Sequence, residues 1–136
     1  MLRYLIDTDI CIYISKNHSP ILRARFELLK QGEAAISAIN FGEMLFGAEK
    51  SQFGAASMAR LRGFIEHVPV LPLDEDVAET YASIRAHLER KGTPIGANDL
   101  WIGAHALTLG ITLVTNNDKE FKRIPKLKIE NWTKKS

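Results

Sequence analysis

Cysteine is almost absent from this chain of 136 residues, in which Cys11 is the single one. One cysteine excludes an internal disulfide and a cysteine-based zinc site, so we expect Cys11 to be a small apolar core residue. No apolar run approaches the length that spans a bilayer, and the first residues lack the basic segment and apolar stretch of a signal peptide. These absences predict a cytoplasmic protein without a membrane segment.

Several motifs of catalytic and metal-binding sites are also absent from the sequence. The chain has no glycine-rich phosphate-binding loop and no nucleophile-elbow serine. Its four histidines, at positions 18, 67, 87 and 105, lie in separate segments without the spacing of metal ligands. His105 lies six residues after Asp99, on a different face of a predicted helix. We therefore expect His105 to be a hydrogen-bonded core residue.

The composition, 46% hydrophobic and 25% charged, is ordinary for a globular protein, and the length predicts one domain over residues 1–136. The net charge of +2 is too small to indicate a partner. From residue 119 onward, however, seven Lys and Arg residues stand against Glu120 and Glu130. Such a segment attracts a polyanion, although solvated basic tails are common.

Strand-like and helix-like segments alternate along the chain. Hydrophobic periodicity and turn residues predict strands at 2–6, 34–37, 68–73, 111–114 and 127–129. They predict helices at 8–16, 20–31, 38–49, around 58–65, 75–91 and 98–107, and loops at 17–18, 51–56 and 93–97. Prolines restrict the segment 68–73 to an edge strand or a strand end. The alternation predicts an α/β fold, a three-layer α/β/α sandwich around a mostly parallel sheet.

Carboxylates collect at one end of this predicted sheet. Asp7 follows the first strand, Glu43 lies in the helix after the second, Asp99 begins the buried helix, and Asn117 and Asp118 follow a late strand. Individually they have simpler roles, as helix caps, turn residues or solvated side chains. Together they form a depression of like charges, which a hard cation such as Mg²⁺ or Mn²⁺ would relieve. Waters on such a cation can attack phosphorus.

These residues are similar to a known pattern. The chain resembles the PIN-domain nucleases, and among them the VapC toxins of bacterial toxin–antitoxin pairs, over essentially its whole length. The matching segments are residues 5–9, 37–51, 96–99, 113–121 and 130–132. The resemblance implies a Mg²⁺-dependent endoribonuclease that cleaves single-stranded loops of structured RNA, and its Asn-Asn pattern is similar to that of VapC proteins that cut the anticodon loop of initiator tRNA(fMet).

The same resemblance implies roles for individual residues. Asp7 and Asp99 correspond to metal-ligand carboxylates and Glu43 to the third acidic position. Asn117 falls at the fourth position, where the family often has aspartate, with Asp118 one residue further on. The resemblance also implies a small VapB-type antitoxin as partner, and a homodimer that assembles with it into a hetero-oligomer.

An antitoxin would have two surfaces to use. An arginine could enter the anionic site in place of Mg²⁺, because a guanidinium pairs with carboxylates. An amphipathic helix could pack near Ile12, Ile14, Phe41 and Leu45, unless these residues form core. Two other classes of protein remain open from the residues alone. One is a haloacid-dehalogenase-like phosphatase with Asp7 as nucleophile, and the other is a non-enzymatic phospho-receiver module with Asp74 as acceptor.

Overall fold

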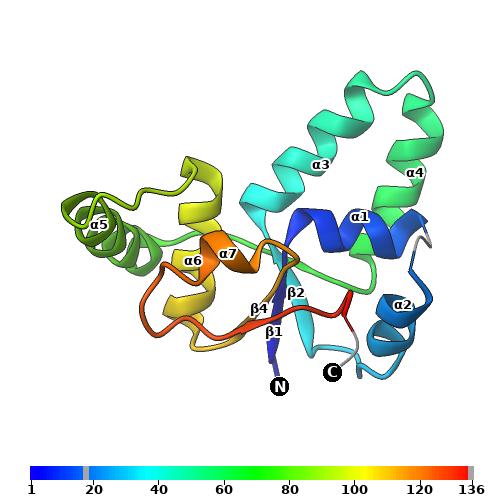
Figure 1. The fold of residues 1–136 in the computed structure, drawn as a ribbon. Coiled ribbons are helices and arrows are strands. Elements are labelled where there is room, and N and C mark those ends of the chain that lie inside the picture. The colour runs from blue at the N-terminus through cyan, green and yellow to red at the C-terminus, as the bar shows by residue number, and fades with distance from the viewer. Residues whose placement is uncertain (17–18, 135–136) are drawn as a thin grey trace.

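The computed structural model describes residues 1–16 and 19–134, and the helix exit predicted at Asn17 and His18 lies outside these residues. A parallel five-stranded sheet runs through the molecule in the order β3-β2-β1-β4-β5. Its central strands β2, β1 and β4 are labelled in Figure 1. The strands are β1 (Tyr4–Ile6), β2 (Ala34–Ser37), β3 (Val70–Leu71), β4 (Thr112–Val114) and β5 (Ile129–Glu130). The predicted α/β sandwich with a parallel sheet is confirmed, and β3 is an edge strand, as its flanking prolines require.

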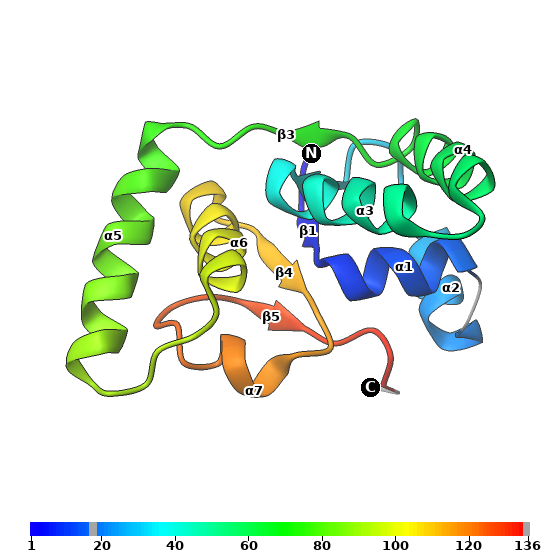
Figure 2. The same cartoon turned by 90° about the horizontal axis from the view of Figure 1, so that it is seen from above.

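Helices cover both faces of the sheet, as the view from above shows (Figure 2). One group consists of α1 (Thr8–Lys16), α2 (Pro20–Glu27), α3 (Ala38–Lys50) and α4 (Gly54–Ile65). The other consists of α5 (Glu75–Arg90) and α6 (Ala97–Leu109), with the short α7 (Asp118–Phe121) beside β5. Among the described helices, none is long and apolar enough to cross a membrane.

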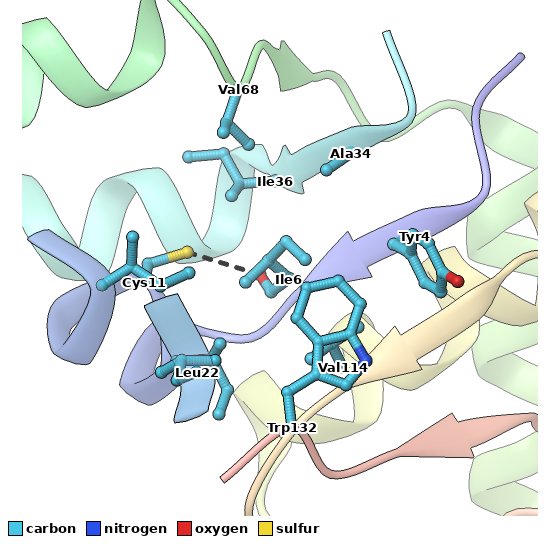
Figure 3. Close-up of a cluster of buried hydrophobic side chains, with 11 residues drawn as sticks. Tyr4, Ile6, Cys11, Leu22, Ala34, Ile36, Val68, Val114 and Trp132 are labelled. Carbon is cyan, nitrogen blue, oxygen red and sulfur yellow. Dashed lines mark hydrogen bonds between the residues drawn. The ribbon is translucent and has the colours of Figure 1, made fainter. Parts of the chain in front are cut away.

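Alternate side chains of β1 enter two separate cores, because neighbouring residues of a strand point to opposite faces. Tyr4 and Ile6 pack on the side of α1 and α2. There the rings of Tyr4 and Trp132 pack edge to face, with their centres 4.9 Å apart (Figure 3). Cys11 is fully buried in the same core, as predicted. Leu5 points to the opposite side and packs against α5 and α6.

Helix α6 is the most deeply buried helix and lies close to its neighbours. A β-carbon at Gly103 would meet the end of the Ile124 side chain, so a larger residue here would force that side chain to move. His105 is 2% exposed, and its Nδ1 lies 3.0 Å from the Ser37 hydroxyl at the end of β2. The prediction of a hydrogen-bonded core histidine is confirmed, and this contact ties α6 to the sheet.

Several predicted boundaries are wrong. The helix that begins at Pro20 ends at Glu27 rather than near residue 31, because the chain turns at Leu28 and Leu29 reaches the core from that turn. Helix α4 begins at Gly54, inside the predicted loop, and the last strand begins at Ile129 rather than 127. The four-residue helix α7 is absent from the predicted elements, because so short a helix has little periodicity to detect.

Candidate metal and active site

Asp7 lies directly beyond the central strand β1 and is 6% exposed. Its main-chain N–H donates to the Val114 carbonyl at 2.9 Å, which continues the pairing of β1 with β4. Its Oδ1 accepts from the Thr8 N–H and its Oδ2 from the Thr115 hydroxyl, both at 2.8 Å. Burial raises the pKa of Asp7 although these two hydrogen bonds oppose the rise. A carboxylate held in this way is oriented both by the first residue of α1 and by the residue that follows β4, which a simple helix cap does not need.

Glu43 lies on α3, beside the start of α1, and is partly buried. The Thr8 hydroxyl donates to Glu43 Oε1 at 3.4 Å, a long hydrogen bond between the two helices. Burial and then the negative charge of Asp7 raise the pKa of Glu43. The structure thus brings Glu43 to the site at Asp7 rather than leaving it on a solvated face.

Asp99 occupies the first turn of α6 and is partly buried. Burial raises its pKa to about 7, with further contributions from the charges of Asp7, Glu120 and Glu43 and from a hydrogen bond with Glu120. The carboxylates of Asp7, Glu43, Asp99 and Glu120 therefore interact electrostatically at the carboxyl edge of the sheet. This is the placement expected for ligand sites in parallel sheets.

The fourth carboxylate of this group is Glu120, which the sequence reasoning did not single out. Its Oε1 accepts from the Gly96 N–H at 2.8 Å and its Oε2 from Asn117 Nδ2 at 2.9 Å. Asp118 accepts from Asn131 at 2.9 Å instead. The spacing of three residues between Asn117 and Glu120 is the signal that could have indicated the pair, since it places both on one side of a helical turn.

Glu120 and Asp99 form a carboxyl–carboxylate pair. Burial would raise the pKa of Glu120, but hydrogen bonds from Gly96, Asn117 and Asp99, together with the charge of Arg123, lower it. Because the pKa of Asp99 rises while that of Glu120 falls, the shared proton belongs mainly to Asp99. The pair therefore carries one negative charge below the pKa of Asp99, which is about 7, and two above it.

The donor chemistry of this site fits a hard divalent cation. Its side chains offer carboxylate oxygens, and a cation would stabilise the ionised forms that burial, and then mutual repulsion, disfavour in Asp7, Glu43 and Asp99. Over residues 1–16 and 19–134, no three His, Cys, Asp or Glu side chains already converge as metal ligands. The carboxylates are thus neighbours that would have to draw together around the ion.

A groove of about 200 Å³ runs between α1, α3 and α4 and reaches the site at Glu43. Its apolar wall includes Ile12, Met44, Leu61 and Phe64, and polar groups border it at Lys16, Ser51, Ser57 and Arg60. Among the residues considered for antitoxin contact, Ile12 lines this groove. Ile14 is 6% exposed and Phe41 packs beside it, so both belong to the core instead.

Basic side chains border the opposite side of the site. Lys119, Lys122 and Arg123 are exposed on and just after α7. Arg123 Nη1 donates to the Pro94 carbonyl at 2.9 Å, in the loop that also supplies the Gly96 N–H to Glu120. Lys134 Nζ lies 3.6 Å from Asp118 Oδ2, and Lys135 is outside the described residues. Part of the predicted polyanion-binding segment therefore flanks the carboxylates.

Fold and site together define a class of proteins, the PIN domain, whose family model matches residues 4–127. The chain belongs to the PIN domain family. Within it, the chain is 41% identical to a tRNA(fMet)-specific endonuclease VapC of Shigella flexneri, covering 98% of this chain and 100% of that protein. It is 40% identical to ribonuclease VapC2 of Rickettsia felis, over 96% of this chain and 98% of that protein.

Solved structures agree with this relationship. DNA-bound VapBC from Salmonella typhimurium contains a chain that is 42% identical, with a TM-score of 0.92 over 97% of this chain and 99% of that one. VapBC-1 from nontypeable Haemophilus influenzae matches with a TM-score of 0.90 and 38% identity, over 98% and 100%. The predicted VapC ribonuclease family is confirmed, and the phosphatase and phospho-receiver alternatives are set aside. Asp74 caps α5 by accepting from the Val77 N–H at 3.1 Å.

Proposed function

We propose that this protein is a divalent-metal-dependent endoribonuclease toxin that cuts tRNA in the anticodon loop, with initiator tRNA(fMet) as the favoured substrate. The observation that carries the proposal is the group of four neighbouring carboxyl groups, those of Asp7, Glu43, Asp99 and Glu120, beside an exposed basic segment. Relatives from Shigella and Salmonella, 41% and 42% identical, are tRNA(fMet)-specific endonucleases by name. A tRNA substrate places the protein in the cytoplasm.

Asp7 and Asp99 would hold the ion, Mg²⁺ or Mn²⁺, with Glu43 and Glu120 completing the acidic site. When bound, the ion lowers the pKa of water and stabilises charge on the phosphate. The chain's own groups prepare this site: Thr115 and Thr8 orient the Asp7 carboxylate. Asn117 belongs to the site as a positioning residue, because its amide orients Glu120, and Glu120 in turn accepts a hydrogen bond from the protonated form of Asp99.

The partner in this proposal is a VapB-type antitoxin, and the toxin forms a homodimer within the assembled hetero-oligomer. Relatives occur in solved VapBC complexes, which supports such a partner. The groove between α1, α3 and α4 would take an apolar helix of the antitoxin, and it leads to Glu43. An arginine of that segment would then enter the acidic site and pair with its carboxylates.

The direct test is cleavage of transcribed initiator tRNA by the purified protein in Mg²⁺, compared with an elongator methionine tRNA and with chelator. We expect one cut in the anticodon loop of the initiator, none in chelator, and none with the Asp7→Ala or near-isosteric Asp7→Asn variant. Sequencing RNA ends after brief expression in cells would check the substrate without choosing it beforehand. Equal cutting of both tRNAs would refute the initiator preference, and cutting in chelator would refute the metal requirement.

A further inference from the structure

The side-chain amide of Asn40 is buried next to the acidic site and has no role in the function proposed above. Asn40 is in the first turn of α3, and its exposed fraction is 0%. Its Nδ2 donates to the Ile6 carbonyl oxygen at 2.7 Å, a short hydrogen bond between residues 34 positions apart. Ile6 immediately precedes Asp7, so this bond holds the end of β1 at the point where the first carboxylate emerges.

The same carbonyl receives a second buried donor. Cys11 Sγ lies 3.8 Å from the Ile6 oxygen (Figure 3), a weaker contact because a thiol is a poor donor. Cys11 belongs to α1 and Asn40 to α3, so the Ile6 carbonyl joins both helices to the central strand. The amide of Asn40 makes the shorter of the two contacts and is the stronger constraint.

Asn40 is also linked to the second carboxylate of the site. Glu43 follows it by three residues on α3, which places the two on neighbouring positions of the helix surface. Glu43 itself accepts a hydrogen bond from the Thr8 hydroxyl, but this bond is long at 3.4 Å and only partly buried. Of the two side-chain hydrogen bonds that connect α3 to residues 6–8, the one from Asn40 is therefore the shorter and the more buried.

Stability alone does not explain an asparagine at this place. Its Oδ1 is buried, and no protein group in the described part of the chain donates to it. A buried acceptor without a donor destabilises the folded state, which offsets much of what the hydrogen bond to the Ile6 carbonyl contributes. A leucine of similar size would avoid the unpaired oxygen but would leave the Ile6 carbonyl with only the weak Cys11 contact. We propose that Asn40 is a positioning residue for the metal site: its amide holds α3 against the end of β1, so that Asp7 and Glu43 face one cation. This inference rests on the proposed metal-dependent function.

The experiment measures Mn²⁺ binding to the isolated protein by titration calorimetry, together with the midpoint of thermal unfolding in chelator. Asn40→Leu removes the donor at nearly constant volume, and Asn40→Ala serves if leucine does not fit. The matched control is Thr108→Val, which removes hydrogen bonds of 2.8 and 2.7 Å at the far end of α6. We expect Asn40→Leu to weaken Mn²⁺ affinity at least tenfold while its unfolding midpoint stays close to that of the wild type, because loss of the bond to Ile6 and removal of the unpaired Oδ1 offset each other. Thr108→Val should leave the affinity unchanged.

The possible results distinguish failure of the positioning role of Asn40 from failure of the proposed metal-dependent function. Unchanged Mn²⁺ affinity in both Asn40 variants would overturn the positioning role while leaving the metal site intact. Loss of folding in both variants would also overturn it, because Asn40 would then serve stability. A wild-type protein that binds no Mn²⁺ would refute the proposed metal site itself. Weak binding in well-folded Asn40 variants, with a normal Thr108→Val control, is the supporting result.

Discussion

Replacing Asp99 with asparagine should stabilise the metal-free protein at neutral and alkaline pH while abolishing cleavage. Burial, then repulsion from Asp7 and Glu120, raises the pKa of Asp99 from 3.8 to about 7. Between these values the folded protein keeps a proton that the unfolded chain has released. The stability of the wild type therefore falls as the pH rises from 3.8 to about 7 and stays lowered above it. Asparagine keeps the shape of the side chain and has no charge to repel.

The size of the gain follows from the same pKa. The interval from 3.8 to about 7 corresponds to an upper limit of about 4 kcal/mol in the free energy of unfolding. Asp99 is only partly buried, and its contact with Glu120 lowers the pKa of that partner, so part of the gain is cancelled. After this discount for solvent screening we expect about 1–2 kcal/mol, or about 3–8 °C in the unfolding midpoint.

Thermal unfolding followed by circular dichroism, in chelator at pH 4 and pH 8, would measure this difference. The gain of Asp99→Asn over wild type should be present at pH 8 and absent at pH 4. Glu79→Gln, an exposed position on α5, is the control for loss of a negative charge and should show no such gain. An equal difference in unfolding midpoint between Asp99→Asn and wild type at both pH values would refute the reasoning. A lower midpoint for Asp99→Asn than for wild type at pH 8 would also refute it. Retained Mg²⁺-dependent cleavage by Asp99→Asn would remove Asp99 from the metal site.

Three further predictions concern the surroundings of Asp99. Asn117→Asp should tighten Mn²⁺ binding in calorimetry but destabilise the metal-free protein, because a carboxylate would replace the amide donor to Glu120. If Asp118→Ala impairs cleavage more than Asn117→Ala, the assignment of this loop is off by one residue. RNA affinity should fall steeply with salt, and a smaller slope is expected when three exposed cations are neutralised together: Lys119, Lys122 and Arg123. Mn²⁺ should bind more weakly to the toxin–antitoxin complex than to the free toxin, whereas equal affinities would mean that the antitoxin leaves the acidic site open.

The parts of the fold that depend on regular patterns are predictable from the sequence. The helix over 8–16 and the strand over 34–37 have the predicted boundaries, because continuous apolar periodicity and clear turn residues define them. Asp7 and Asp99 follow from the rule that ligands gather at the carboxyl ends of parallel strands. Their roles in catalysis stay a prediction.

Glu120 is harder to predict, because its place depends on contacts that no local pattern encodes. It joins the site through the N–H of Gly96, which is 24 residues away, and through a helix of four residues. The short helix turns Asp118 toward Asn131 and Glu120 toward Asp99. A tertiary arrangement therefore decides which of two neighbouring acidic residues belongs to the site.

The groove and the acidic site differ in how far apart along the chain their parts lie. Every residue that lines the groove falls between positions 11 and 64. The acidic site instead needs Asp7 beside Thr115, residues 108 positions apart, and carboxylates from α3, α6 and α7. Closing a loop of this length costs more conformational entropy than closing the shorter loops within residues 11–64, so we expect the groove to form before the acidic site. A partly folded chain with its first half in place could therefore present the groove to a partner before it has assembled a centre able to cut RNA.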